Sequence, residues 1–247
     1  MHPIASNPRA RRSGRLIVMM LTASWLGLLA GTPAHGADVN LSGGVLSFSI
    51  PPGSPVIPNR LEITVAGSDY VLDERAEPIA LGAGAIDAGC AVLTANKVTC
   101  PIAAVISFNI STGLNADVLD LSGALVPVVV TLGDGNDRVI GGAADDVFIW
   151  TPGDDNDTID GGPGRDTLDF RGSNVAEIFT VARDGEDFVL FRNVASVRLD
   201  TRSIESLELS SFGGADQVVT TGLPKTSQSF VDADDGQTDS VTIDAAF

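Results

Sequence analysis

The stretch 161–169 reads GGPGRDTLD, and it is the last of four similar nine-residue segments. The others are LGDGNDRVI at 132–140, GGAADDVFI at 141–149 and PGDDNDTID at 152–160. Each segment has an aspartate at its sixth place and a large apolar residue two places later. Repetition of this kind indicates a fold of stacked units, each too small to bury a core by itself.

The composition of one repeat predicts a turn followed by a short strand. Glycines at the first, second and fourth places permit backbone conformations that a β-carbon forbids, so the first six residues can turn tightly. The last three residues, polar-apolar-polar, form a minimal strand with one inward side chain. The sixth-place aspartates, spaced by 9, 11 and 9 residues, are Asp137, Asp146, Asp157 and Asp166.

Stacking these units also stacks their carboxylates, because all ten acidic residues of 132–169 are aspartates. Two carboxylates about 5 Å apart repel by roughly 3 kcal/mol at an effective dielectric of about 20. The stack therefore requires a cation. Short carboxylates and exposed turn carbonyls form an all-oxygen site, which favours calcium over zinc or copper, and flexible turns do not impose the octahedral geometry of magnesium.

The four segments resemble the glycine-rich nonapeptide of the bacterial RTX, or haemolysin-type, calcium-binding repeat proteins, whose consensus is G-G-x-G-x-D-x-U-x with U a large apolar residue. The resemblance implies a right-handed parallel β-roll, in which two nonapeptides make one coil and calcium lies between consecutive turns on one edge. It implies that 132–137 shares an ion with 152–157, and that 141–146 shares one with 161–166. The ligands it implies are Asp137, Asp157, Asp146 and Asp166, assisted by Asp134, Asn136, Asp145 and Asp154.

The segments depart from this consensus in the middle of the series. The departures are Leu132 and Pro152 at the first place, Ala144 and Asp155 at the fourth place, and the inserted pair Trp150-Thr151. We expect them to disturb the geometry of the two middle turns, which leads to an estimate of about two bound calcium ions. A weaker copy, TGLNADVLD, occupies 112–120, and the echoes around Asp216 and Asp239 are predicted to be ordinary turns.

The rest of the chain after residue 36 is predicted to be all-β. Short β-branched or alternating runs such as RLEITV, VISFNI and DFVLF are separated by Gly, Asp, Asn and Pro. Asp184-Gly185 reads as a hairpin turn. Cys90 and Cys100 bracket CAVLTANKVTC, which predicts a hairpin closed by a disulfide. The expected architecture is a β-roll or β-solenoid with flanking β-hairpin segments.

The amino-terminal residues predict export. Arg9, Arg11, Arg12 and Arg15 precede the apolar run LIVMMLTASWLGLLA, and small residues follow it, as in a cleavable export signal. Cleavage is expected after Gly36, with Ala34 at the −3 position. The run is shorter than the roughly 20 residues of a spanning helix. The mature protein is then expected to be secreted or attached to the cell surface.

The sequence divides into four segments: the export signal at 1–36, an amino-terminal β segment with the disulfide hairpin at 37–108, the calcium-binding repeats at 109–170, and a carboxy-terminal β-solenoid and hairpin segment at 171–247. The first and last of the three mature segments also resemble, more loosely, the regions that flank such repeats in exported bacterial proteins.

Charge and composition restrict the function. The chain has 32 acidic against 15 basic residues, and four of those basic residues lie in the export signal, so nucleic acid and anionic membrane surfaces are not expected partners. Both histidines precede residue 37, which removes Ser-His and Cys-His catalysis from the mature chain. We therefore predict a calcium-binding protein that is not an enzyme.

Two other functions remain compatible with the sequence. One is a surface adhesion or assembly scaffold, with a cell-surface or self-association partner. The other is a polysaccharide-binding or polysaccharide-modifying β-solenoid, for which an Asp-rich exposed groove with a central Arg or Lys, together with a raised carboxylate pKa, would be evidence. The mature chain has one tyrosine, Tyr70, and one tryptophan, Trp150, and this small supply for stacking on sugars disfavours the second function.

Overall fold

Strands dominate the computed structural model of the protein, which describes residues 36–52, 54, 57–223, 227–232 and 237–244. The prediction of an all-β chain is confirmed. The helices of this described part are short. They are α1 (Ala83–Asp87) and two single 3-10 turns, η1 (Ile102–Ala104) and η2 (Val194–Ser196).

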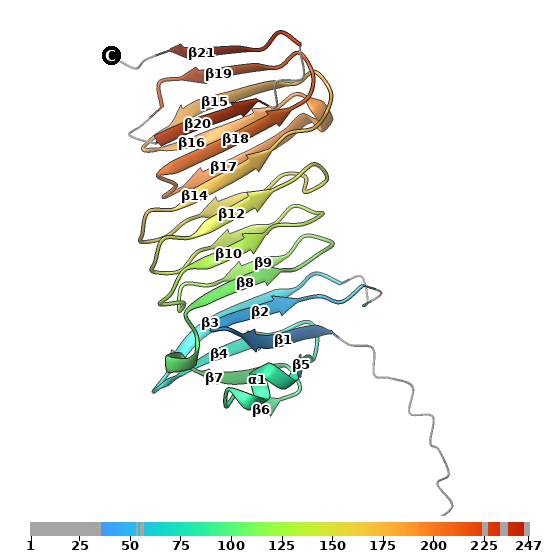
Figure 1. The fold of residues 1–247 in the computed structure, drawn as a ribbon, viewed down its shortest axis with the longest axis vertical. Helices are drawn as coiled ribbons and strands as arrows, with labels where there is room; N and C mark the ends of the chain where they lie inside the picture. Colours follow the sequence, from blue (N-terminus) through green and yellow to red (C-terminus); the bar gives the residue numbers. More distant parts are fainter. Residues whose placement is uncertain (1–35, 53, 55–56, 224–226, 233–236, 245–247) are drawn as a thin grey trace, which may run out of the picture. The chain divides into compact units, whose positions relative to one another are not determined.

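The strands form two hydrogen-bonded sheets (Figure 1). Sheet A contains, in spatial order, β20 (Ser227–Asp232), β18 (Ser206–Phe212), β14 (Thr167–Arg171), β12 (Val147–Trp150), β10 (Val128–Thr131), β8 (Ser107–Ser111), β2 (Val45–Ser49), β1 (Ala37–Ser42) and β5 (Ile79–Leu81). Sheet B contains β21 (Ser240–Asp244), β19 (Gln217–Thr221), β15 (Ile178–Asp184), β16 (Asp187–Arg192), β17 (Val197–Arg202), β13 (Thr158–Asp160), β11 (Arg138–Ile140), β9 (Val118–Asp120), β3 (Arg60–Ala66), β4 (Asp69–Glu74), β7 (Lys97–Pro101) and β6 (Ala91–Thr94).

In the middle of the chain, successive strands alternate between the two sheets. From β8 to β14 the even-numbered strands lie side by side in sheet A, and β9, β11 and β13 lie side by side in sheet B, all in parallel. Arg138 pairs with Thr158 and Val147 with Thr167, so one circuit of the chain through both sheets takes 20 residues there. The turns between the strands are thereby brought into register as well.

Both sheets are mixed rather than purely parallel. Antiparallel pairs occur between β1 and β2, between β3 and β4, in the run β4-β7-β6, and in the run β15-β16-β17. The parallel arrangement that the resemblance implies therefore holds for the central strands, and hairpins flank it on both sides. Each sheet runs without interruption through strands of all three predicted mature segments.

Alternation along each strand fills the space between the sheets. Leu119, Val139 and Ile159 lie in register in sheet B, and each is buried. Phe148 and Leu168 do the same in sheet A. These are the apolar residues at the eighth place of the repeats or of the weaker copy. Their burial supplies the hydrophobic free energy, roughly 1.5–3 kcal/mol for each side chain, that holds the circuits together.

The predicted disulfide hairpin is present. Cys90 and Cys100 are bonded, and β6 and β7 pair in antiparallel fashion on either side of the turn at 95–96. Asp184 and Asp187 close the β15-β16 hairpin, as the Asp-Gly turn predicts. The predicted export signal, 1–36, lies outside the described residues except for Gly36. In the described part of the chain, no helix is long and apolar enough to cross a membrane.

Candidate metal site

The sixth-place aspartates of the repeats lie on two edges of the molecule, one before each sheet. The first edge forms a chain of hydrogen bonds between backbone amides and carboxylates. The amide of Asp117 donates to Asp137 Oδ1 at 2.7 Å, and the amide of Asp137 donates to Asp157 Oδ1 at 2.8 Å. The amide of Asn59 donates to Asp117 Oδ1 at 2.6 Å. We call Asn59, Asp117, Asp137 and Asp157 the first ladder.

The second edge repeats this arrangement before the strands of sheet A. The amides of Val128 and Asp146 each donate, at 2.8 Å, to the Oδ1 atom of the next aspartate, Asp146 and Asp166 respectively. The amide of Asp166 donates to Glu205 Oε2 at 2.8 Å. We call Val128, Asp146, Asp166 and Glu205 the second ladder. A glutamate thus continues a series of aspartates, because its longer side chain reaches the same amide.

A third ladder lies near the carboxy terminus. The amide of Glu177 donates to Asp216 Oδ1 at 2.8 Å, and the amide of Asp216 donates to Asp239 Oδ1 at 2.7 Å. Sequence reasoning treated Asp216 and Asp239 as ordinary turn residues and did not single out Asp117 or Glu205. Their places in the ladders depend on which circuits stack, and for Glu205 and Asp216 the intervening hairpin hides that relation.

One oxygen of most ladder aspartates remains unused. The Oδ2 atoms of Asp117, Asp137, Asp157, Asp166 and Asp216 are buried and have no hydrogen-bond partner within the described residues. A buried carboxylate oxygen without a donor carries a desolvation penalty of about 1–3 kcal/mol or more. Buried carboxylate oxygens without a donor thus occur on both edges, and a positive charge near them would offset this penalty.

The pKa values of several ladder aspartates are raised in the folded protein. Burial, opposed by the hydrogen bonds from the backbone and reinforced by neighbouring carboxylates, raises the pKa of Asp137 to about 7 and that of Asp157 to about 8. The same causes raise the pKa of Asp117 to about 6 and that of Asp166 to about 7. The pKa of Asp146 is raised as well, first of all by burial.

The four additional residues named by the resemblance occupy the turns in different ways. Asp134, Asn136 and Asp145 are exposed. Asn136 Oδ1 accepts from the amide of Asn156 at 3.1 Å, and Asp145 Oδ1 accepts from the amide of Arg165 at 2.9 Å.

Asp154 is buried instead and caps its own turn. One of its oxygens accepts from the amide of Thr151 at 2.6 Å, and both lie within hydrogen-bond distance of the Thr151 hydroxyl. Burial raises the pKa of Asp154, and the charge of Asp134 adds to this effect. The carboxylate of Asp154 also raises the pKa values of Asp137 and Asp157, which places it in the electrostatic environment of the first ladder.

Glycine allows the turns to stack backbone against backbone. Gly135 has φ of 138°, and a β-carbon there would overlap with the carbonyl group of Asn115. Gly164 has φ of 149°, and a β-carbon there would overlap with the carbonyl group of Ala144. Both glycines are at the fourth place of their repeats, where the positive φ values exclude most other residues.

The departures from the consensus do not interrupt the stacking, contrary to expectation. Asp155 takes the fourth place with φ of 58°, a left-handed conformation that Asp and Asn tolerate. Trp150 of the inserted pair is buried, and its Nε1 donates to the carbonyl of Asp155 at 3.1 Å. Thr151 is the partner of Asp154. The inserted residues therefore pack and cap the turn, and the 20-residue register continues past them.

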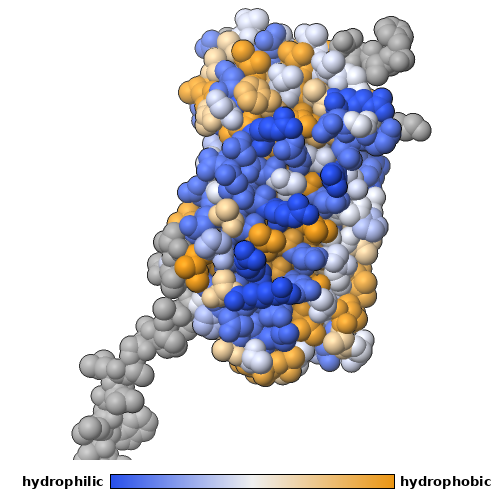
Figure 2. All heavy atoms as spheres, turned by 180° about the vertical axis from the view of Figure 1, so that it is seen from behind, coloured by the Kyte–Doolittle hydropathy of each residue, from blue (hydrophilic) through white to orange (hydrophobic). Residues whose placement is uncertain are grey.

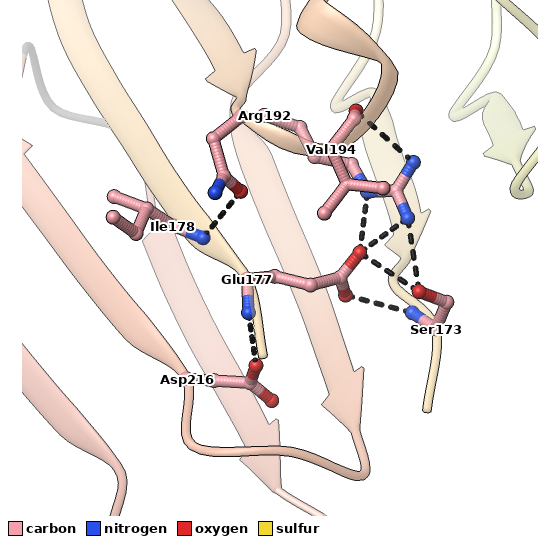
Figure 3. A network of polar contacts seen from close by, with 7 residues as sticks. Ser173, Glu177, Ile178, Arg192, Val194 and Asp216 are labelled. Atoms are coloured by element: carbon pink, nitrogen blue, oxygen red, sulfur yellow. Dashed lines mark hydrogen bonds and ion pairs between the residues drawn. The ribbon is translucent and has the colours of Figure 1, made fainter. Parts of the chain in front are cut away.

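A buried ion pair lies where the repeats meet the β15-β16-β17 hairpins (Figure 3). Arg192 and Glu177 form it, and both side chains are buried. The amide of Ser173 donates to Glu177 Oε2 at 2.7 Å, and the Arg192 guanidinium lies 5.5 Å from the centre of the Trp150 ring. Trp150 in turn stacks on Phe170 with ring centres 4.2 Å apart. Glu177 thus belongs to two features: its side chain pairs with Arg192, which lies over Trp150, and its amide donates to Asp216 in the third ladder.

A polar groove of about 720 Å³ lies on sheet B between β13, β17 and the tip of the β15-β16 hairpin. Hydrophilic residues are prominent across the middle of the face shown in Figure 2. The charged residues that line the groove are Arg138, Asp160, Asp184, Asp187, Asp200 and Arg202.

The ladder residues fit a hard cation in the chemistry of their atoms. They offer buried carboxylate oxygens that lack donors, next to turns whose glycines bring backbone carbonyls close together. Among the described residues, the side chains of His, Cys, Asp and Glu do not form a group of three or more that could hold a metal ion. An ion at a ladder would therefore depend on backbone carbonyls or water for much of its shell, as calcium sites commonly do.

Comparison with known proteins gives no relative: no family model, no curated protein and no solved structure matches the chain.

Proposed function

We propose that this protein is an exported calcium-binding protein of the RTX type, in which Asp- and Gly-rich turns bind Ca²⁺ and stabilise a right-handed parallel β-roll. The observation that carries the proposal is the set of buried, unpartnered Oδ2 atoms along the first and second ladders. The 20-residue circuit with strands alternating between two parallel arrays supports the β-roll.

Each ladder aspartate has two tasks in this proposal. Its Oδ1 atom accepts the amide of the preceding circuit, and its Oδ2 atom is available to calcium, except in Asp146, whose Oδ2 accepts the amide of Gly142 at 2.6 Å. Asp137 with Asp157 on the first edge, and Asp146 with Asp166 on the second, are the principal ligands. Calcium supplies the positive charge that the chain itself does not place at these oxygens, and so couples ion binding to folding.

The proposed export of the protein fits such coupling. Extracellular calcium modules bind with dissociation constants of about 10⁻⁴ to 10⁻³ M, so they fill outside the cell and not in the cytosol. The ladders of a newly exported chain would then gain their cation only after export. About two ions are expected, one for each principal pair.

The decisive experiment is a calcium titration of the mature protein after chelation, followed by far-ultraviolet circular dichroism and by the fluorescence of Trp150. We expect a saturable gain in β signal and a shift in Trp150 emission, because this ring is buried beside the repeats. Magnesium at the same concentration should produce neither. A flat response in both signals would overturn the proposal.

A pair of variants makes the titration specific to the ladder. Asp157→Asn keeps an oxygen that can accept the amide of Asp137 but removes the charge, so the calcium response should weaken by about tenfold or more. Asp155→Asn removes a charge from the same turn at an exposed position whose left-handed backbone suits asparagine, and should leave most of the response intact. Equal losses in both variants would indicate general charge screening instead of a site.

The groove on sheet B favours polysaccharide binding as a second candidate function. Arg138 and Arg202 lie in it beside Asp160, Asp184, Asp187 and Asp200. The guanidinium and carboxylate groups of this groove can hydrogen-bond the hydroxyl groups of a glycan. Glycan binding that is lost in Arg138→Gln with Arg202→Gln, but kept when calcium is removed, would support this function.

A further inference from the structure

Glu77, in the loop between β4 and β5, has a buried and unpartnered carboxylate far along the chain from the repeats. The residue is only 2% exposed. Both of its carboxylate oxygens are buried and lack a hydrogen-bond partner among the residues that the structure describes. Burial raises the pKa of Glu77, and the neighbouring charge of Glu74 adds to this effect. A buried carboxylate of this kind requires a cation or a donor.

A second carboxylate near Glu77, that of Glu74, already accepts hydrogen bonds. Glu74 is fully buried and accepts hydrogen bonds from the amides of Arg60 at 3.0 Å and Ala76 at 2.8 Å. Two basic side chains of this region pair with other acids, Arg75 with Glu62 and Lys97 with Asp73. Glu77 forms no such ion pair within the described part of the chain.

Gly36, the last residue of the predicted export signal, lies against the Glu77 side chain. A β-carbon built on Gly36 would lie 2.6 Å from Glu77 Cβ and 3.0 Å from Glu77 Oε2. The next residue, Ala37, is fully buried at the start of β1, and its amide donates to the carbonyl of Pro78 at 2.9 Å. The expected cleavage point between Gly36 and Ala37 therefore lies directly beside the carboxylate.

We propose that the amino terminus released by cleavage between Gly36 and Ala37 is the cation that pairs with Glu77. This inference rests on the export part of the proposed function and not on calcium binding. Hydrolysis adds one water across the Gly36–Ala37 peptide bond. The carboxylate product leaves with the signal, and the amine of Ala37 takes up a proton to become an ammonium.

The number of hydrogens on the nitrogen of Ala37 explains why this pairing requires cleavage. Before cleavage the nitrogen of Ala37 has one hydrogen, which is donated to the carbonyl of Pro78, so nothing on it remains for Glu77. After cleavage the ammonium has three hydrogens and a positive charge. It can keep the bond to Pro78 and use the remaining hydrogens for Glu77, in the space that Gly36 vacates. Processing thus stabilises the mature fold at the start of β1.

The test uses the mature protein that begins at Ala37, as the wild type and as Glu77→Gln. Intact mass first establishes the terminus of the exported protein. The rate at which an amine-specific acylating reagent modifies the α-amine at about pH 8 is then measured, because pairing keeps the amine protonated. We expect this rate to be about tenfold lower in the wild type than in Glu77→Gln, as follows from a pKa difference of about one unit. Glu208→Gln, at an exposed position of β18, is the control and should react like the wild type.

Thermal unfolding provides a second and independent readout. Acetylation of the Ala37 amine, or retention of Gly36 as the first residue, should lower the melting temperature of the wild type and leave that of Glu77→Gln nearly unchanged. An exported chain that begins elsewhere than Ala37, equal acylation rates, or equal effects of acetylation in both backgrounds would each overturn the proposal. All measurements are made both with calcium and with chelator, so a failure of calcium binding remains distinguishable from a failure of this pairing.

Discussion

The amide of Asp137 donates a hydrogen bond of 2.8 Å to Oδ1 of Asp157, the residue twenty positions later, while Oδ2 of Asp157 is buried without a partner in the described structure. One carboxylate therefore joins two circuits of the chain. It also places a buried negative charge between them that no hydrogen-bond donor compensates. The same relation holds between Asp146 and Asp166 on the other edge. Neutralisation of this negative charge, by protons or by a cation, is expected to stabilise the ladders.

Replacing Asp157 by asparagine should stabilise the metal-free protein. The pKa of Asp157 is raised to about 8, so at neutral pH the folded state has to hold a proton or a buried charge that the unfolded chain does not. Removing that group should increase the free energy of unfolding in chelator by about 1–4 kcal/mol. Urea unfolding with excess chelator measures it. In saturating calcium the order should reverse, and a variant that is less stable than the wild type under both conditions would contradict this.

The metal-free protein should lose stability as the pH rises from about 4 to about 8. Folded-state pKa values of about 6 for Asp117, about 7 for Asp137 and Asp166, and about 8 for Asp157 exceed the unfolded value near 4. The folded state thus binds more protons in this range, and its stability is complete below the unfolded pKa and is lost through the folded values. Unfolding curves at a series of pH values in chelator test the sign, which calcium should reduce or invert. A stability that increases between pH 5 and 8 in chelator would show that the carboxylates are not buried as described.

Two glycine substitutions should separate close backbone stacking from backbone strain. Gly135 and Gly153 both have positive φ, 138° and 117°, but only a β-carbon on Gly135 would meet another backbone, that of Asn115. Gly153→Ala should cost about 1 kcal/mol from the unfavourable φ alone. Gly135→Ala should cost about 1–3 kcal/mol more, because two circuits have to move apart. Denaturant unfolding in calcium compares the two variants, and equal losses would contradict the stacked arrangement of turns 113–115 and 133–135.

Replacing Arg192 by leucine should destabilise the protein by about 3–5 kcal/mol, because Glu177 is then left buried without its partner. The emission of Trp150 should change at the same time, since the guanidinium lies over its ring. Arg198→Leu is the control: it removes an exposed pair with Asp200 and should change stability by less than about 1 kcal/mol. Adding Glu177→Gln to Arg192→Leu should restore part of the loss, and a strictly additive result would show that the two side chains are not coupled.

The relation between sequence and structure differs from one ladder residue to another. The resemblance to the RTX nonapeptide was enough to predict that 132–137 lies beside 152–157 and 141–146 beside 161–166, because two repeats of nearly constant length make one circuit there. Glu205 could not be found in this way, because the β15-β16-β17 hairpins separate it from Asp166 by 39 residues. The spacing of repeated residues along the sequence gives the length of a circuit only where no additional segment is inserted into that circuit.

By itself the sequence determined the all-β class, the disulfide hairpin and the position of the Asp-rich turns, since these follow from periods of two and of nine to eleven residues and from local turn chemistry. Only the tertiary structure decided which oxygen of each aspartate is used by the backbone, and that Glu77 lies against Gly36. Such facts depend on burial and on contacts between segments that are distant in the chain. Hydrogen bonding and desolvation depend on which atoms the fold brings together. The periodicity of the sequence does not contain that information.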